Sequence, residues 1–286
     1  MTTPNRTAAP KLTDIARIDL SCGSFDALRA IDFSRTFPPH FHDTFAIGVI
    51  ESGATRLRTR RGEWIGRAGT VLAFSPGEIH AAEPLTEHGF TYRMIYPSVD
   101  LIREIGLRSP ALRRDGPLFT VPVIDDPALA GELARAHVPL MDGVSGGHGE
   151  SRFIAAVRAL VARYASEPGT AAGCRLVDMQ VVERAREYLR ARFTEAVRIR
   201  TLADVCGVSP YHLIRVFHRV VGVPPYAYLI QLRVNRAQAM LCKGACVADV
   251  AYACGFSDQS HLTRTFRKAV GIPPGQYLRS VRAPAA

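Results

Sequence analysis

The chain has 286 residues, of which 47% are hydrophobic and 22% are charged, so it is long enough for two domains and has the composition of a folded globular protein. This composition excludes a largely disordered or collagen-like chain. The longest apolar runs, such as residues 45–50, are far shorter than the roughly 20 residues that span a bilayer, and no charged-then-apolar leader opens the sequence. We therefore expect a cytoplasmic protein with no membrane partner.

The positive charge is concentrated in the C-terminal part of the chain. Lys and Arg number 36 against 26 Asp and Glu, which gives a net charge of +10. Residues 1–175 contain 20 basic and 19 acidic residues, whereas residues 176–286 contain 16 basic and 7 acidic. This asymmetry predicts that the C-terminal part binds a polyanion.

The N-terminal half has the pattern of short strands. Residues 1–14 are expected to form a flexible arm. Apolar or alternating runs then follow, separated by turn signals about ten residues apart, which is typical of an antiparallel sandwich or small barrel. The runs are residues 45–50, 55–60, 70–74 and 90–96, and the turn signals are SG at 52–53, RG at 61–62, AG at 68–69 and SPG at 75–77. We therefore expect a β domain that starts at residue 15.

Three histidines in this half are candidates for a binding site. His40 and His42 lie in the segment PPHFHDTF, so on one strand both imidazoles share a face. His80 follows a turn in the segment SPGEIH. These HFH and PGEIH segments resemble the HxH and PGxxH motifs of the cupin barrel, over roughly residues 25–100. The resemblance implies a barrel in which the three imidazoles face one cavity.

These histidines allow three interpretations: a pocket for an organic effector, a site for a divalent transition metal with Glu83 as the nearest acid, or a purely structural cluster. The stretch DTFAIG supplies Asp43 but not the glutamate that cupin enzymes carry after HxH, and this absence weakens the case for a metalloenzyme. We prefer the effector pocket, with no bound metal and no cofactor. The expected effector-binding residues are His40, His42, Glu78 and His80.

Two helical patterns follow the predicted strands, at residues 126–141 and 151–166. In the second, apolar residues recur at intervals of three and four and form one stripe. The stripe consists of Ile154, Val157, Leu160, Val161 and Tyr164. It can pack on its own domain or pair with the same helix of a second subunit, so the sequence allows a homodimer. Residues 167–175, which begin with EPGTAAG, are expected to be an interdomain linker.

The basic C-terminal part contains an internal repeat. LADVCGVSPYHLIRVFHRVVGVPPYAYL, which starts at Leu202, aligns with VAYACGFSDQSHLTRTFRKAVGIPPGQYL, which starts at Val250, with one extra residue in the second turn. The matched pairs include Cys206 with Cys254, Gly207 with Gly255, Ser209 with Ser257, and Phe217 with Phe266. Each copy predicts a helix-turn-helix, because a short apolar helix ends at a glycine and a serine then caps a second helix.

The second helix of each copy has an apolar face and a polar face. Leu213, Phe217 and Val220 share the apolar face in the first copy, as do Leu262, Phe266 and Ala269 in the second. The polar faces offer donors and cations that suit base edges and phosphates in a major groove. One helix over residues 226–243, about 27 Å long, is predicted to join the copies and to place them in major grooves about 34 Å apart.

Residues 178–281 resemble the DNA-binding domain of the AraC/XylS family of bacterial transcription regulators, including the run GFSDQSHLTRTFRKAVGIPPGQY. The resemblance implies that the third and sixth helices of this domain contact DNA. The expected DNA-binding residues are Tyr211, Ile214, Arg215 and Arg219 in the first copy, and Gln259, Ser260, His261, Arg264 and Arg267 in the second. Ile214 departs from the polar residue often found at its position and offers only an apolar contact.

These patterns and resemblances predict an α+β two-domain protein, in which a cupin-like β-barrel with packed helices precedes an all-α domain with two helix-turn-helix units. The expected segments are an arm (1–14), an effector-binding domain (15–166), a linker (167–175) and a DNA-binding domain (176–286). We expect a ligand-responsive transcriptional regulator and no enzyme, since no GxSxG, P-loop or dinucleotide motif occurs. Its expected partners are double-stranded promoter DNA, a small-molecule effector and RNA polymerase. The alternative is a cupin-type metal sensor or metalloenzyme tethered to a DNA-binding domain.

Overall fold

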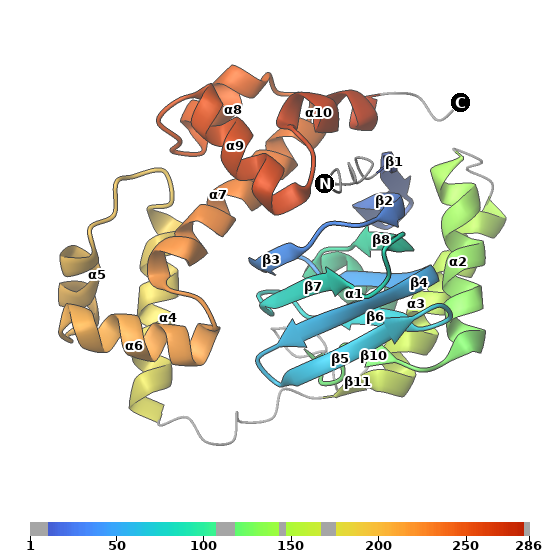
Figure 1. Cartoon of the computed structure of the whole chain (residues 1–286), viewed down its shortest axis with the longest axis horizontal. Helices are drawn as coiled ribbons and strands as arrows, with labels where there is room; N and C mark the ends of the chain where they lie inside the picture. Colours follow the sequence, from blue (N-terminus) through green and yellow to red (C-terminus); the bar gives the residue numbers. More distant parts are fainter. Residues whose placement is uncertain (1–10, 107–117, 143–146, 167–175, 283–286) are drawn as a thin grey trace, which may run out of the picture.

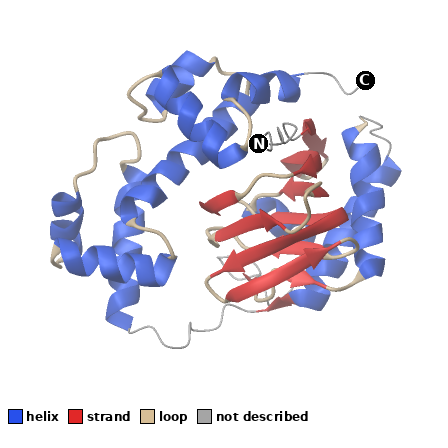
Figure 2. Ribbon diagram, in the orientation of Figure 1, coloured by secondary structure: helices blue, strands red, loops and turns tan. Residues whose placement is uncertain are grey.

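Strands and helices occupy separate parts of the chain. The computed structural model describes residues 11–106, 118–142, 147–166 and 176–282 (Figure 1). All strands lie at or before residue 166, and the described chain from residue 176 onward contains only helices and loops (Figure 2). The α+β two-domain fold predicted from the sequence is confirmed. Within the described ranges, no helix is both long enough and apolar enough to cross a membrane.

The N-terminal unit is built on a nine-stranded antiparallel sheet. The path of the sheet runs β1-β2-β8-β4-β6-β10, while β3, β5 and β7 pair beside it. The strands are β1 (Lys11–Leu20), β2 (Gly23–Phe33), β3 (Phe37–His40), β4 (Ala46–Thr59), β5 (Gly62–Arg67), β6 (Val71–Phe74), β7 (His80–Pro84), β8 (Phe90–Tyr96) and β10 (Val123–Ile124). A separate pair is formed by β9 (Leu118–Phe119) and β11 (Ala165–Ser166).

The long strand β4 changes its partners along its length: its first part pairs with β6, and its last part pairs with β5 and β7. The sequence predicted two strands here with a turn at Ser52 and Gly53, and that prediction is wrong. The chain makes a bulge between Ile50 and Ser52, and Gly53 adopts φ +74°. A glycine in the left-handed region bends a strand without ending it. A Cβ atom at this position would also lie 2.4 Å from the carbonyl oxygen of Gly89.

Three helices complete the N-terminal unit: α1 (Val99–Gly106), α2 (Pro127–Met141) and α3 (Gly147–Tyr164), of which α2 and α3 lie on the same side of the sheet (Figure 1). Phe153, Val157 and Leu160 of α3 are at most 2% exposed, and Phe153 stacks on Phe25 of β2 with ring centroids 4.7 Å apart. Of the two alternatives for the apolar stripe of this helix, packing within its own unit is therefore the one observed.

The helical unit contains two helix-turn-helix pairs. The first pair is α5 (Ile199–Cys206) with α6 (Pro210–Val221), and the second pair is α8 (Val247–Ala253) with α9 (Gln259–Val270). The helix α7 (Pro225–Cys242) joins the two pairs. The unit begins with α4 (Leu176–Ala191) and ends with α10 (Pro274–Arg282). Ser209 caps α6 as predicted. In the second pair the predicted serine cap is wrong: Asp258 accepts the bond from the His261 N–H at 2.7 Å, because the extra residue in that turn places the aspartate, not Ser257, at the cap.

Both helical cores include side chains of the N-terminal unit, whose strands and connecting loops are called the barrel below. Phe41 and Ile79 belong to the core built by α4 to α7, and Ile15 belongs to the core built by α7 to α10. None of these three side chains is more than 9% exposed. The barrel and the helical unit are therefore packed against each other through apolar side chains.

Candidate functional site

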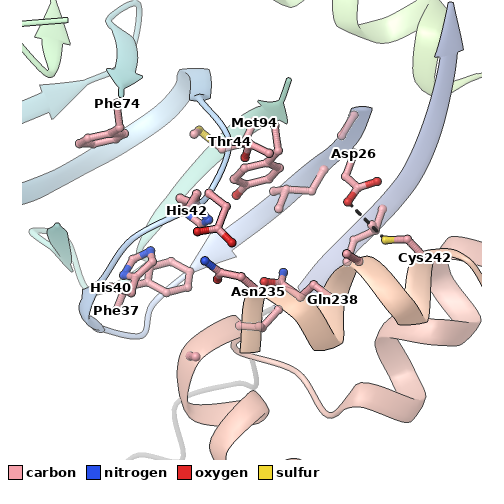
Figure 3. Close-up of a pocket in the computed structure, with 18 of the residues that line it drawn as sticks. Asp26, Phe37, His40, His42, Thr44, Phe74, Met94, Asn235, Gln238 and Cys242 are labelled. Carbon is pink, nitrogen blue, oxygen red and sulfur yellow. Dashed lines mark hydrogen bonds between the residues drawn. The ribbon is translucent and has the colours of Figure 1, made fainter. Parts of the chain in front are cut away.

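A cavity of about 400 Å³ lies where the barrel meets α7 and α10 (Figure 3). Its volume is in the range of pockets that hold small molecules. The barrel supplies aromatic and aliphatic side chains, which include Phe37, Leu57, Leu72, Phe74, Tyr92 and Met94. The connecting helix α7 supplies polar side chains, which include Gln231, Asn235, Arg236, Gln238 and Cys242. Both units therefore form the walls of one cavity.

The three predicted histidines come together in the barrel part of this cavity. His40 ends β3 and His80 begins β7, and the two residues are paired directly in the register of these strands. Their ring centroids are 4.4 Å apart, and the ring of His42 lies 5.1 Å from that of His40 and 5.4 Å from that of His80. Phe74 stacks on His80 at 3.9 Å. The alternation of side chains expected from the HFH segment thus brings His40 and His42 to the same face.

Backbone carbonyl groups orient two of these imidazoles. Nδ1 of His40 lies 2.8 Å from the carbonyl oxygen of Pro38, and Nδ1 of His80 lies 3.0 Å from that of Glu78. A carbonyl oxygen only accepts hydrogen bonds, so each Nδ1 carries the proton and donates it. The Nε2 atom of each ring then has a free lone pair and acts as an acceptor.

Burial keeps these rings uncharged at neutral pH. It lowers the pKa of His40 below the usual value of 6.5, and it lowers the pKa values of His42 and His80 well below that value. Repulsion from neighbouring imidazoles adds to the effect at His42 and His80. This end of the cavity therefore offers neutral acceptors in apolar surroundings.

The same cluster has the donor spacing of a metal site. One nitrogen atom from each of the three histidines lies within 4.8 Å of the others. Among the described residues no carboxylate joins this group. Glu83, the acid that the sequence places nearest, lies 3.4 Å from Arg58 and 3.8 Å from Arg56 on neighbouring strands. A metal ion here would therefore have three imidazole ligands and open positions for water or a ligand.

Glu78 was grouped with the histidines in the sequence prediction, but its side chain does not line the cavity. Its carboxylate accepts a hydrogen bond from the Ser75 N–H at 3.3 Å and lies 3.7 Å from Arg61. Burial raises the pKa of this carboxyl group. Only the backbone carbonyl of Glu78 serves the site, through His80.

Sequence reasoning missed the walls contributed by the helical unit. Asp26 of β2 and Cys242 of α7, which both line the cavity, form a hydrogen bond of 3.3 Å in which the thiol donates (Figure 3). Asn235 donates to the carbonyl oxygen of Phe41 at 3.3 Å. The sequence did contain one signal of this wall. The polar residues Gln231, Asn235, Gln238 and Cys242 of α7 are spaced by four, three and four residues, so they form a polar stripe beside the apolar stripe of the helix.

The polar face of α6 is open to solvent at its N-terminal end. The side chains of Tyr211 and Ile214 are 77% and 41% exposed, and Arg215 is exposed as well. Arg219 is placed differently, because its guanidinium lies 2.5 Å from the carboxylate of Asp178 in α4. Among the described residues, no acid pairs with Tyr211, Ile214 or Arg215, three of the four residues predicted to contact DNA from this helix.

The polar face of α9 lies partly towards the barrel. Gln259, Ser260 and Arg264 are exposed, whereas the ring of His261 is half-buried beside Phe256 at 5.3 Å. A second cavity, of about 380 Å³, separates this helix from residues 33–37 of the barrel. Its cationic side chains are Arg35, Arg264, Arg267 and Lys268, and no carboxylate is among the residues that line it. The predicted DNA-binding cations of α9 therefore stand opposite a cation of the barrel.

Two family matches cover most of the two units. The AraC-like ligand-binding domain family matches residues 23–160, and a helix-turn-helix domain family matches residues 202–280. The uncharacterized HTH-type transcriptional regulator YbfI of Bacillus subtilis is 30% identical over 235 residues, which cover 82% of this chain and 84% of that protein. The HTH-type transcriptional activator RhaS of Yersinia pestis is 35% identical over 75 residues, which cover 26% of this chain and 28% of RhaS.

Solved structures share the two-unit arrangement. ToxT from Vibrio cholerae aligns with a TM-score of 0.57 and 13% identity, over 94% of this chain and 97% of that chain. ToxT with a bound unsaturated fatty acid aligns with the same TM-score and 11% identity, over 97% and 98% of the two chains. At these identities the similarity establishes a common fold.

Proposed function

This chain belongs to the AraC family of HTH-type transcriptional regulators, and we propose that it controls promoter DNA through an effector held in the cavity between its barrel and its helical unit. It is a ligand-responsive, sequence-specific DNA-binding regulator. The observation that carries the proposed site is that both units line one cavity of about 400 Å³. A molecule bound there contacts the effector-binding half and the DNA-binding half at the same time. The affinity of the protein for this molecule then depends on how the two halves are arranged. A ligand that binds two arrangements with different affinities can shift the protein between them and so change its DNA binding.

We divide the chain accordingly into an arm (1–14), an effector-binding domain (15–166), a linker (167–175) and a DNA-binding domain (176–286). Residues 11–14 of the arm form the start of β1, while residues 1–10 and 167–175 lie outside the part of the chain that the structure describes. The proposed regulator acts in the cytoplasm, without a catalytic function and without a membrane partner. The YbfI and RhaS relatives described above are named as regulators, which favours this function over a metalloenzyme.

The proposed effector has a hydrogen-bond donor at its buried end. His40 and His80 present Nε2 lone pairs whose tautomers are set by the carbonyl groups of Pro38 and Glu78. A hydroxyl or an amino group satisfies such acceptors, whereas an ionised carboxylate has no hydrogen to donate and leaves them unpaired. The walls next to these rings are aromatic and aliphatic. We therefore propose an apolar or aromatic body with a hydroxyl or amino end group.

This chemistry differs from that of the fatty acid named for the Vibrio cholerae ToxT structure. A carboxylate in this chain would be better placed at the α7 side of the cavity, where Arg17, Arg236 and Lys243 contribute cations. Arg17 is already paired with Asp26 at 2.7 Å. The polarity of the cavity thus orients a ligand with its donor group towards the histidines.

The test is a binding assay with the full chain. A DNA duplex is selected from a random library by the protein itself, and fluorescence anisotropy then reports its affinity while compounds are added in matched pairs such as 2-phenylethanol and phenylacetate. We expect hydroxyl or amino compounds to change the DNA affinity, and His80→Leu to abolish that response. A response restricted to carboxylates would contradict the effector chemistry. Failure to select any preferred duplex would contradict the function.

A metal ion is the second candidate ligand for the histidines, because their nitrogen atoms lie within 4.8 Å of one another. His40, His42 and His80 would hold it, and it would supply a Lewis acid with open positions for an effector oxygen. Metal analysis of protein purified without a chelator decides between the two. Stoichiometric zinc, iron or manganese that is lost in His40→Ala would identify a metal-responsive regulator.

The proposed DNA contacts use the two recognition helices α6 and α9. Tyr211, Ile214 and Arg215 of α6, and Gln259, Ser260, His261 and Arg264 of α9, would contact bases, while Arg219 and Arg267 would contact phosphates. Arg219 would have to leave Asp178 to do so. The proposed base readers of α6 are exposed, whereas in α9 the ring of His261 is half-buried and Arg264 lies in the cavity that faces the barrel, so α9 would have to leave the barrel to enter a groove.

Two further partners are proposed without an assigned surface. Contact with RNA polymerase is expected if the regulator activates transcription. A homodimer would have to use a surface other than the apolar stripe of α3, because that stripe is buried against the sheet. Light scattering at micromolar concentration, with and without the selected duplex, distinguishes a monomer from a dimer.

A further inference from the structure

The two segments that carry the cavity histidines also carry apolar residues that face the opposite way. Phe41 lies between His40 and His42, and Ile79 precedes His80. Because successive side chains of an extended chain point to opposite sides, the imidazoles face the cavity while Phe41 and Ile79 face the helical unit. The segments 40–42 and 79–80 therefore each contact the cavity with their histidines and the helical unit with their apolar side chains.

Phe41 is part of the core of the first helix-turn-helix. It is 1% exposed, and its ring stacks on Tyr228 of α7 with centroids 4.7 Å apart and planes 17° from parallel. Tyr228 in turn meets Phe217 of α6 edge to face at 5.5 Å. The carbonyl oxygen of Phe41 also accepts the hydrogen bond from Asn235 of α7. Two aromatic contacts thus connect the residue between the cavity histidines to the first recognition helix.

Ile79 makes a second connection at the end of the same helix. Gly222 ends α6 in the left-handed region, with φ +96°. A Cβ atom placed on Gly222 would lie 3.8 Å from the side chain of Ile79, which is ordinary van der Waals contact. The side chain that precedes His80 therefore lies beside the turn that ends α6.

We propose that Phe41 and Ile79 are positioning residues that transmit occupancy of the histidine end of the cavity to the orientation of α6. This proposal rests on the effector site proposed above. The paired register of His40 with His80 makes the two segments move together, so a ligand that shifts the imidazoles also shifts both apolar side chains. Packed cores respond to such shifts by changing between discrete arrangements, and the first helix-turn-helix is the core concerned.

A purely structural role makes a different prediction from this one. If Phe41 and Ile79 only fill space, then emptying the cavity side of the barrel leaves α6 unchanged, apart from a general loss of stability. If they transmit, then emptying the cavity side changes α6 selectively, and filling it again reverses the change. Ile50 provides the matched control, because it is buried in the barrel interior at 1% exposure but does not line the cavity.

The experiment measures amide hydrogen exchange in the full chain without DNA. In His80→Gly we expect exchange of residues 210–221 to accelerate by about fivefold or more relative to residues 199–206, and imidazole, added as a probe that refills the vacated ring space, to restore the wild-type rate. In Ile50→Ala the same ratio should stay within about twofold. If His80→Gly does not fold, His40→Gln serves as the cavity-side variant, compared directly with wild type.

A second arm removes the connection itself. When Phe41→Leu and Ile79→Ala are added to His80→Gly, imidazole should no longer alter exchange in residues 210–221. The control adds Leu202→Ala, a truncation in the same core on α5, to His80→Gly, and the imidazole response should remain intact. An α6 that is insensitive to His80→Gly, or an imidazole response that persists without Phe41 and Ile79, would overturn the proposal. Because no DNA is present, failure of the chain to bind DNA would contradict the proposed function and leave this result interpretable.

Discussion

Arg60 of the barrel donates a hydrogen bond of 2.7 Å to the carbonyl oxygen of Val220, in the last turn of the recognition helix α6. Arg35 of the barrel does the same for the other recognition helix, with a bond of 3.3 Å to the carbonyl oxygen of Gly271 at the end of α9. The last carbonyl groups of a helix lack partners within the helix and carry the negative end of its dipole. Both recognition helices are thus held at their C-terminal ends by cations of the effector-binding half.

Removing both arginines should release the recognition helices from the barrel. We expect Arg35→Ala combined with Arg60→Ala to bind the selected duplex about three- to tenfold more tightly, because α9 no longer has to leave the barrel to reach DNA. Fluorescence anisotropy measures this change. Arg56→Ala is the control, since Arg56 pairs only with acids on neighbouring strands in the described contacts. Weaker binding by the double variant would mean that these arginines contact DNA themselves.

Arg264 is the proposed base reader of α9 with the longest reach. Arg264→Ala should cost about 1 to 3 kcal/mol on the selected duplex and reduce the preference for it over random DNA. Arg279→Ala, an exposed arginine of α10 outside the recognition helix, should cost less. Equal losses on selected and random duplexes would assign Arg264 to a phosphate.

The isolated fragment 176–286 should bind DNA with a steep dependence on salt, because nine of the ten net positive charges of the chain lie within it. It should also be less stable than the same region in the full chain. Without the barrel, the first helix-turn-helix loses the burial of Phe41 and Ile79, each worth about 2 kcal/mol. Hydrogen exchange should therefore show faster opening of α6 in the fragment than in the full chain. Equal exchange rates in the two proteins would show that these contacts contribute nothing to stability.

The stability of the full chain should fall as the pH drops below about 6.5. His137 of α2 is buried with Nδ1 3.1 Å from Arg93, and burial together with this cation lowers the pKa of His137 to about 4. Between pH 6.5 and 4 the unfolded chain binds a proton that the folded chain does not, so acid favours unfolding. The loss for this residue approaches about 3 kcal/mol at the lower end of the window.

The cavity histidines act in the same direction, because their pKa values are also lowered. Urea unfolding at pH 7.5 and pH 5 measures the effect. His137→Leu should reduce the difference in unfolding free energy between the two pH values, and His88→Ala, at an exposed position, should leave it unchanged. A stability that rises on acidification would contradict the buried, neutral state of these rings.

Features that depend on neighbouring residues in the chain were predictable from the sequence. The glycines at 207 and 255 and the apolar faces around Leu213 and Leu262 depend on spacing within about ten residues, and together with the duplication they identified both helix-turn-helix units. The position of His40 opposite His80 followed from a resemblance in two short motifs. These signals are strong because helix and strand periodicity is a local property.

Features that depend on packing between the units were not predictable in this way. Nothing near Cys242 in the chain indicates that its thiol meets Asp26, which lies 216 residues away. The sequence accordingly placed the cavity inside the barrel, whereas α7 supplies one of its walls. At Gly53 the local signal was present but ambiguous, because a glycine after a serine suits a bulge as well as a turn.

The two stripes of α7 have a consequence for evolution and engineering. One stripe packs in the helix-turn-helix cores and the other lines the ligand cavity, so residues such as Asn235 and Gln238 are carried by the DNA-binding half although they face the effector site. Ligand preference is therefore divided between the effector-binding half and the DNA-binding half. A chimaera that joins this barrel to the helical half of a relative would inherit a hybrid cavity, and it should respond to neither parent's ligand unless the polar stripe of α7 is transplanted with the barrel.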